Sequence, residues 1–288
     1  MTDLMRHIAD LSQDRCKLAE RLFRQPGTIA SISPRSETKD IPLSFAQEQL
    51  WFLDQFQPGN PSYHIAASMR FRGALDPVSL EQALRTIVAR HDILRTSFVT
   101  LDGKPVQVIA PIVTLEDVPL VDLRPLPEGE TEEKSHELAV QEARQPFDLA
   151  HGPLLRVKLL GLSDEEHVLI LVVHHIVADG WSMRVLLCEL LQLYEAFVAG
   201  QQVSLPKLTI RFADYASWQR SSQQREVFER QLDYWKDRLA GDPSTLDLPT
   251  DRPRPATQTF HGSQHAFHLP ATIVEQLREL GKDRKSVV

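Results

Sequence analysis

Hydrophobic positions follow two different periods along this chain, and together they predict alternating helices and strands. One uninterrupted run of apolar, largely β-branched residues at 168–173 predicts a strand that is buried on both faces. Residues 65–72 alternate apolar and polar side chains, which predicts a strand with one exposed face. Apolar stripes spaced by three and four residues predict helices at 77–88, 183–198 and 223–239.

Turn residues separate these elements and indicate how strands are joined. The pair Asp102-Gly103 stands between SFVTL and KPVQVI, which predicts a tight β-hairpin. Polar residues at 163–166 predict a turn into the buried strand, and the acidic stretch 128–145 predicts an exposed helix. The pattern as a whole predicts an α/β fold that contains antiparallel hairpins.

We expect three regions along the chain. Residues 1–40 combine an amphipathic helix at 4–24 with a linker rich in Pro, Gly, Ser and Thr. This region is either a terminus without a role or a helix that docks to a second protein chain or connects domains. The main globular region covers residues 41–222, and residues 223–288 begin with the amphipathic helix at 223–239.

Composition excludes several classes of partner. The 288 residues include 42% hydrophobic residues, enough for a sizeable core, and 39 acidic against 32 basic residues give a net charge of −7. This balance argues against nucleic acid, because binding to phosphates needs a basic face. No apolar run reaches the roughly 20 residues that span a bilayer, so we expect no membrane association. Two distant cysteines, Cys16 and Cys188, and no signal-peptide pattern predict a cytoplasmic protein.

The end of the buried strand carries the residues best suited to chemistry. His174 and His175 follow the apolar run directly, and Asp179-Gly180 opens the next helix. Adjacent side chains on an extended chain point to opposite faces, so one imidazole packs and the other faces a cavity. The same divergence argues against a metal site, because no third ligand has suitable spacing. No Gly-rich loop follows a strand, so nothing predicts a nucleotide site.

Four motifs occur in a fixed order along the chain. Residues 174–180 spell HHxxxDG, which resembles the core motif of condensation domains from nonribosomal peptide synthetases, within the superfamily of chloramphenicol acetyltransferase. PLSFAQEQLWFL resembles the motif SxAQxRLWxL, with Gln49 in place of its arginine. RHDILRTSF matches RHxxLRTxF at every fixed position, and FADYASW resembles YxDYAxW with Phe212 for its first tyrosine.

The resemblance implies a chloramphenicol-acetyltransferase-like lobe, in which helices flank a mixed sheet. Condensation domains place two such lobes in a V, with the active site in a tunnel between them. Residues 41–222 resemble the N-terminal lobe, and 223–288 resemble a crossing helix and the start of a second lobe. Because the fifth family motif is absent, the domain looks C-terminally truncated. The form of the first motif resembles the subtype that accepts an L-aminoacyl donor.

The resemblance also implies two residues that act on substrate. His175, the second histidine, would face the tunnel and either accept a proton from the amine or position the amine for attack. Gly180 would leave room for the arm that carries the substrate, with its backbone N–H near the donor.

Four other residues would be structural at the site. The resemblance implies that Asp179 pairs with Arg95 of the second motif and locks the loop. His174 would be packed and hydrogen-bonded, and Trp181 would belong to the core. Beside them, Ser182 would cap the following helix.

The function implied is amide-bond formation between a carrier-bound acyl or aminoacyl thioester and a carrier-bound aminoacyl acceptor, in the synthesis of a peptide antibiotic or other secondary metabolite. The partners would be donor and acceptor carrier proteins, and an adenylation domain if the chain continues. The substrates would be tethered to 4′-phosphopantetheine on those carriers, and the chain itself would hold no covalent cofactor.

Two alternatives stay open: an O- or N-acyltransferase that uses CoA or carrier thioesters, and a non-catalytic fragment that binds a carrier protein. We expect the fragment alone to be inactive in condensation.

Overall fold

The computed structural model describes most of the chain from residue 40 onward. The described residues are 32–35, 40–111, 118–127, 129–202, 205–241, 248–253, 265 and 267–283. The helix expected at residues 4–24 lies outside the described residues. The chain forms two compact units, which divide between residues 243 and 244.

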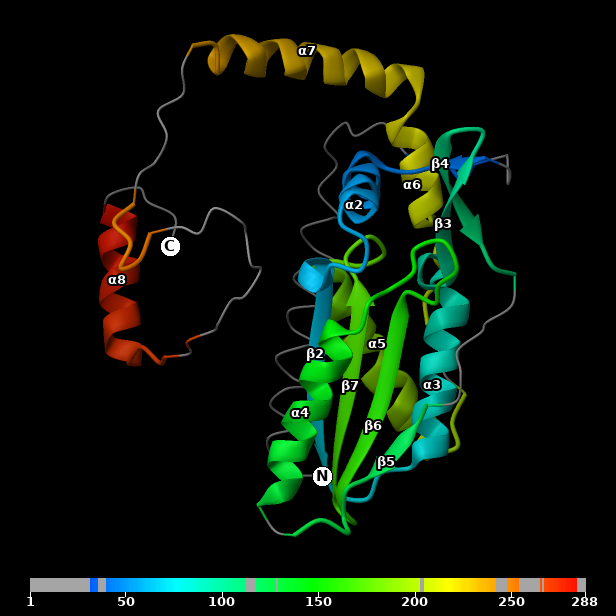
Figure 1. The fold of residues 1–288 in the computed structure, drawn as a ribbon, viewed down its shortest axis with the longest axis vertical. Helices are drawn as coiled ribbons and strands as arrows, with labels where there is room; N and C mark the ends of the chain where they lie inside the picture. Colours follow the sequence, from blue (N-terminus) through cyan, green and yellow to red (C-terminus); the bar gives the residue numbers. More distant parts are fainter. Residues whose placement is uncertain are drawn as a thin grey trace. The chain divides into compact units, whose positions relative to one another are not determined.

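A four-stranded mixed sheet forms the centre of the first unit (Figure 1). Its strands stand in the order β2, β7, β6 and β5. The first three pair antiparallel, whereas β5 pairs with β6 in parallel. The strands are β2 (His64–Arg72), β7 (Glu166–His174), β6 (Leu155–Ser163) and β5 (Leu120–Asp122).

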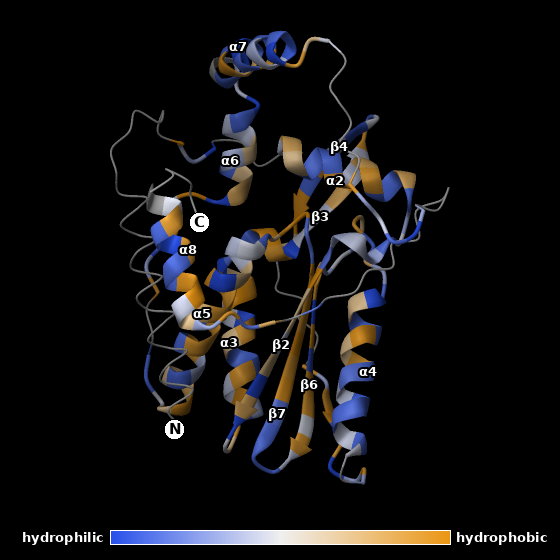
Figure 2. Ribbon diagram, turned by 90° about the vertical axis from the view of Figure 1, so that its left-hand side faces the viewer, coloured by the Kyte–Doolittle hydropathy of each residue, from blue (hydrophilic) through white to orange (hydrophobic). Residues whose placement is uncertain are grey.

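Helices cover both faces of this sheet, as Figures 1 and 2 show. α3 (Pro77–Arg90) and α5 (Gly180–Val198) pack against each other on one face. α4 (Glu130–Arg144) lies against β2, β6 and β7 on the other face. Residues 168–174 of β7 are therefore all buried, which confirms the prediction of a strand covered on both sides.

A smaller antiparallel sheet contains β1 (Ile41–Pro42), β4 (Lys104–Ile109) and β3 (Thr96–Leu101), in that order. Asp102 and Gly103 join β3 to β4 with φ angles of 50° and 77°. Two successive residues with positive φ are typical of a type I′ turn, whose twist matches that of the strands. The predicted hairpin is confirmed.

Side-chain caps determine where the helices around the site begin. Ser44 precedes α2 (Phe45–Phe56), where its hydroxyl accepts a hydrogen bond from the backbone N–H of Gln47. The Gln47 side chain in turn accepts from the backbone N–H of Ser44 at 3.0 Å, which completes a capping box. Asp76 caps α3 and Pro77 takes its first position, where a missing N–H costs nothing.

Among the residues that the structure describes, three further helices follow α5. α6 (Phe212–Gln219) and α7 (Ser222–Arg238) belong to the first unit, and α8 (Ala271–Asp283) belongs to the second. The compact units thus divide later in the chain than the lobe boundary expected at 222–223, which stays a prediction. Among the described residues, no helix has the length and apolar character needed to cross a bilayer.

Burial along β7 predicts a clear difference between two leucine-to-alanine variants. Leu171 is 0% exposed, whereas Leu101 of β3 is 48% exposed. We expect Leu171→Ala to lower the free energy of unfolding by about 2–5 kcal/mol, because it removes buried methyl groups and leaves a cavity. Leu101→Ala, the control, should cost less than about 1 kcal/mol. Urea denaturation followed by circular dichroism measures both, and equal losses would contradict the buried position of Leu171.

Candidate active site

His174, the first histidine of HHxxxDG, is the last residue of β7 and lies in the packed interior. The residue is 3% exposed, and its Nδ1 accepts a hydrogen bond from the backbone N–H of Ile176 at 3.1 Å. A neutral ring with Nδ1 as acceptor carries its proton on Nε2. Burial, assisted by His64 and His175, lowers the pKa of His174 to about 4. The ring is therefore uncharged at neutral pH and holds the loop that follows the strand.

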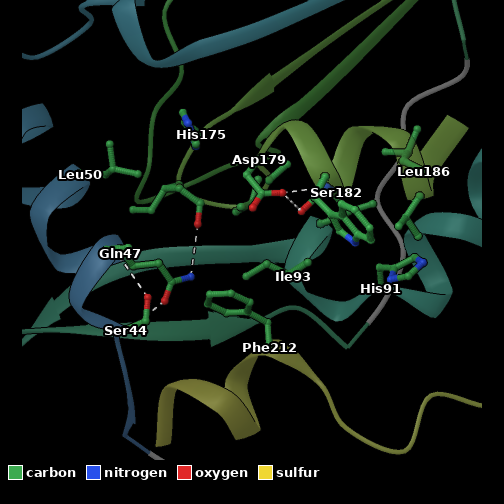
Figure 3. A pocket seen from close by; sticks show the side chains of 17 residues that line it. Ser44, Gln47, Leu50, His91, Ile93, His175, Asp179, Ser182, Leu186 and Phe212 are labelled. Atoms are coloured by element: carbon green, nitrogen blue, oxygen red, sulfur yellow. Dashed lines mark hydrogen bonds between the residues drawn. The ribbon is translucent and has the colours of Figure 1, made fainter. Parts of the chain in front are cut away.

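His175 takes the opposite orientation and lines a pocket (Figure 3). The residue is exposed, although its neighbours on both sides in the sequence are buried. Its backbone N–H donates a hydrogen bond to the carbonyl oxygen of Tyr63 at 2.8 Å, which fixes the backbone while leaving the imidazole accessible. The two histidines thus diverge as alternation along an extended chain requires.

Asp179 caps α5. Its Oδ1 accepts hydrogen bonds from the backbone N–H of Ser182 at 2.7 Å and from the Ser182 hydroxyl at 2.6 Å. The hydrogen bond from the Ser182 side chain is the main reason that the pKa of Asp179 lies below its ordinary value. The expectation that Ser182 is the cap is therefore wrong: Ser182 is the third helical residue and donates to the cap.

The ion pair expected between Asp179 and Arg95 is also absent from this part of the described chain. Nη1 of Arg95 donates instead to the carbonyl oxygen of Ala110, and Nε of Arg95 is buried without a partner. The donors to Asp179 both belong to Ser182, three residues ahead in the chain. Forming these hydrogen bonds closes only a short loop and therefore costs little conformational entropy. Local capping has replaced a long-range ion pair.

Gly180 and Trp181 are the first two residues of α5 and follow Asp179, which lines the pocket. A Cβ placed on Gly180 would meet nothing within 4 Å, so the space beside this residue is open. Trp181 is 45% exposed and lines the pocket, with the guanidinium of Arg184 4.3 Å from its ring centroid. The assignment of Trp181 to the core is wrong, because its side chain lines the pocket, whereas Met183 of the same helical turn is buried.

All four sequence motifs contribute side chains to this pocket of about 370 Å³ (Figure 3). The first motif contributes from α2, the second from the turn before β3, HHxxxDG from the end of β7 and the start of α5, and the fourth from α6. Eleven of the seventeen lining residues are apolar, and six are polar. The lining residues are Ser44, Ala46, Gln47, Leu50, His91, Ile93, Leu94, His175, Ile176, Val177, Ala178, Asp179, Trp181, Ser182, Val185, Leu186 and Phe212.

Gln47 joins two of the motifs, a role that sequence reasoning missed. The residue is 2% exposed, and its Nε2 donates to the carbonyl oxygen of Ile176 at 3.3 Å. The capping box with Ser44 fixes the same side chain from the other end. A glutamine in a capping-box position could have signalled the local bond, but nothing in the sequence indicates the contact with Ile176.

A second polar group at the pocket, His91 with Glu189, was also missed. Nε2 of His91 lies 2.7 Å from Oε2 of Glu189, and Nε of Arg90 donates to Oε1 of Glu189 at 3.2 Å. Burial opposes ionisation of Glu189, but the hydrogen bond from His91 and the charges of His91 and Arg90 hold its pKa below the ordinary value. The partners are 98 positions apart, so no local pattern reveals them.

Within the described residues, no three His, Cys, Asp or Glu side chains form a group that could hold a metal ion. The later histidines that the structure describes, His265 and His268, are exposed.

Capping by Asp179 predicts how two variants differ in stability. Asp179→Ala should lower the free energy of unfolding by about 1 kcal/mol, because the helix loses its side-chain acceptor. Asp179→Asn keeps an acceptor oxygen and should stay within a few tenths of a kcal/mol of the unaltered chain. Thermal unfolding distinguishes them; equal losses in both variants would mean that charge, and not capping, is what Asp179 supplies.

Burial of a neutral His174 predicts that stability falls with acidification. The pKa of His174 is about 4 in the folded chain against an ordinary 6.5, so the unfolded chain binds more protons between these values. The free energy of unfolding should therefore fall by about 3 kcal/mol as the pH drops from 6.5 to 4. Burial also lowers the pKa of the neighbouring His64, which acts in the same direction.

His174→Asn keeps an acceptor near Ile176 but cannot ionise in this range, so urea denaturation should show a weaker pH dependence in this variant. His136→Asn is the control, because His136 is exposed on α4. Parallel pH profiles for the unaltered chain and His174→Asn would show that this ring does not govern the acid response.

Comparison with known proteins agrees with this architecture. The chain is 44% identical over 257 residues to one of the linear gramicidin synthase proteins of Brevibacillus parabrevis, and the match covers 89% of the chain and 3% of that protein. It is 41% identical over 285 residues to the phosphinothricin tripeptide synthetase PhsC of Streptomyces viridochromogenes, covering 97% of the chain and 26% of the relative. The chain thus spans a small part of each curated relative.

A solved structure and a family profile match over most of the chain. The X-domain from teicoplanin biosynthesis superimposes with a TM-score of 0.75 at 31% identity, covering 90% of this chain and 56% of that one. The profile of the condensation domain matches residues 37–287, a range that contains the pocket and all four motifs. This chain belongs to the condensation domain family of nonribosomal peptide synthetases.

Proposed function

We propose that this chain contributes the condensation step of a nonribosomal peptide synthetase, with His175 as the residue that acts on the attacking amine. The observation that carries the proposal is the exposed imidazole of His175 at a pocket to which all four motifs contribute. The hydrogen bond from its backbone N–H to Tyr63 anchors the main chain at this residue, while the imidazole stays exposed.

The reaction joins an amine to a thioester carbonyl. The amine nitrogen attacks the carbonyl carbon, a C–N bond forms, the C–S bond breaks, and the carrier thiolate leaves. The amine must lose a proton along this path, and an imidazole is the side chain best suited to accept it near neutral pH. His175 either takes this proton or holds the amine by a hydrogen bond, while the uncharged His174 places no positive charge beside it.

The substrates of this proposal are acyl and aminoacyl groups on the 4′-phosphopantetheine arms of donor and acceptor carrier proteins. Open space beside Gly180 supports passage of such an arm along the start of α5. Family membership and two synthetase relatives support the same assignment. A condensation reaction needs no nucleophilic side chain, because the acyl group arrives already activated as a thioester.

A second candidate is a non-catalytic binding module. The X-domain that resembles this chain has also been solved as a complex with OxyB, so one relative at this level of identity forms a protein complex. A third candidate is an O- or N-acyltransferase that uses a CoA or carrier thioester. Identification of the product distinguishes this activity from condensation.

The test expresses the complete reading frame that contains this chain, with donor and acceptor carrier proteins loaded with thioesters. We expect His175→Ala to slow formation of the dipeptidyl product on the acceptor carrier by about 10²-fold or more, because the amine loses its proton acceptor or its anchor. The exposed His151→Ala is the matched control and should retain the rate. Mass spectrometry of the acceptor carrier measures the product.

Circular dichroism should show that both variants fold, because both histidines are exposed. A rate within about threefold of the unaltered protein for His175→Ala would reject the role of His175, since loss of a general base costs far more. A complete absence of product with every loaded pair would favour the binding module.

A further inference from the structure

The start of β2 contacts both histidines of HHxxxDG, although it lies outside all four sequence motifs. His64 stands opposite His174, where β2 pairs with β7 (Figure 1). The centroids of the two rings are 5.8 Å apart and their planes meet at 66°, an edge-to-face contact. The preceding residue, Tyr63, accepts the hydrogen bond from the backbone N–H of His175. One end of β2 therefore contacts the ring of the first histidine and the main chain of the second.

Helix α4 anchors the ring of His64 from the other side. Nδ1 of His64 lies 2.8 Å from the carbonyl oxygen of Ala143. A carbonyl oxygen can only accept, so this nitrogen carries the proton of the neutral ring. A second proton goes to Nε2 and leaves the hydrogen bond to Ala143 in place. His64 can therefore become charged without losing its anchor.

His174 has the opposite arrangement of protons. The residue is 3% exposed, and its Nδ1 accepts from the backbone N–H of Ile176 at 3.1 Å. A second proton on this ring goes to Nδ1, where it removes the acceptor and sets two N–H groups against each other. The turn that this bond holds begins with His175. A charge on His174 would therefore release the segment that carries His175.

The ring of Phe147 packs against both histidines of the pair His64 and His174. Its centroid lies 4.9 Å from that of His64 and 6.1 Å from that of His174. The guanidinium of Arg156 lies over the same ring, 3.7 Å from its centroid, so a positive charge stands close to the pair. The charged and titratable side chains that the structure describes around the pair are Arg156 and Lys158 of β6, Glu142 of α4, which pairs with both, and His175 of the loop.

These surroundings disfavour charge on either ring. Burial, followed by the charges of His64 and His175, lowers the pKa of His174 to about 4. Burial and the charge of Arg156 also lower the pKa of His64, whereas its hydrogen bond to Ala143 acts in the opposite direction. Each proton on one ring of the pair thus opposes a proton on the other.

We propose that His64 is a positioning residue of the HHxxxDG loop, which accepts a proton in place of His174 and so preserves the hydrogen bond to Ile176 that holds His175 at the pocket. His64 is the less buried ring of the pair, and it keeps its anchor when charged. It does not line the pocket, so it acts on His175 only through the loop. The positioning rests on these contacts, and its use in condensation rests on the proposed function.

The test follows the imidazole nitrogens of the chain, labelled with nitrogen-15 histidine, by NMR from about pH 8 to about pH 4. In the unaltered chain, His64 should take up a proton at a higher pH than His174, and the amide signal of Ile176 should move only with His174. His64→Asn keeps a donor for Ala143 but no charge, so His174 should titrate about one pH unit or more higher, and Ile176 should follow. His136→Asn, exposed on α4, is the matched control and should leave the titration of His174 unaltered.

Two results would overturn the proposal. The first is protonation of His174 before His64 in the unaltered chain. The second is a His174 ring that is still neutral at about pH 5 in His64→Asn, since the loss of the neighbouring charge should raise the pKa of about 4 by at least that much. Circular dichroism over the same range checks that the variants are folded where they are compared.

His64→Phe separates charge from packing, because phenylalanine keeps a ring beside His174 but takes up no proton. We expect the titration of His174 to move upward in His64→Phe as it does in His64→Asn. A titration that moves in His64→Asn and stays in place in His64→Phe would show that the ring acts by packing alone, which would overturn the proposal.

The carrier assay connects the loop to the reaction. The rate of product formation at about pH 5, divided by the rate at about pH 8, should be about twofold or more lower in His64→Asn than in His136→Asn, because about half of the His174 rings are charged at their pKa. An equal ratio in the two variants would overturn the link between the loop and turnover. A shifted titration of His174 with no product from any loaded pair would overturn the proposed function alone, and product without the shift would overturn only the role of His64.

Discussion

The first unit depends on the complete burial of strand β7. Its backbone pairs with β2 on one side and β6 on the other, and its side chains from residue 168 to 174 are covered on both faces. Such a strand has no exposed face that could tolerate a shift in register, because a slip of one residue would exchange the two faces. The slip would also exchange His174 and His175, so the same burial that stabilises the sheet determines which imidazole faces the pocket.

The loop after β7 keeps this orientation through short, local hydrogen bonds. His174 accepts from the backbone two residues ahead, and Asp179 accepts from the backbone and hydroxyl three residues ahead. Each bond closes only a small loop, so it costs little conformational entropy. Between these two anchors, the side chain of Gln47 on α2 donates to the carbonyl oxygen of Ile176 and connects the loop to α2.

The pocket, in contrast, is assembled from distant parts of the chain. Helix α2, the turn before β3, the start of α5 and the start of α6 each contribute one wall. The rigid sheet holds these ends in place, which is a common way for a scaffold to position chemistry at its loops. The hydrogen bonds of Glu189 with His91 and Arg90 brace the junction between α3 and α5 and orient one imidazole at the pocket.

The sequence by itself determined the features that depend on neighbouring residues. Periodicity identified the buried strand and the helices, because each period corresponds to one geometry of backbone and burial. Asp102-Gly103 identified the hairpin, because the turn requires positive φ at both positions. The alternation of side chains separated the two histidines, and the ordered motifs indicated the family that the comparisons then showed.

Only the tertiary structure decided which distant side chains meet. It gave Asp179 a local partner in place of Arg95, left Trp181 half-exposed, and brought Glu189 to His91 across 98 positions. Such contacts depend on how the helices pack on the sheet. The hydrophobic period does not specify them, because many different residues at each position would satisfy the same period. A sequence pattern therefore specifies which face of a helix is buried, while the packing of that face selects the polar partners around the pocket.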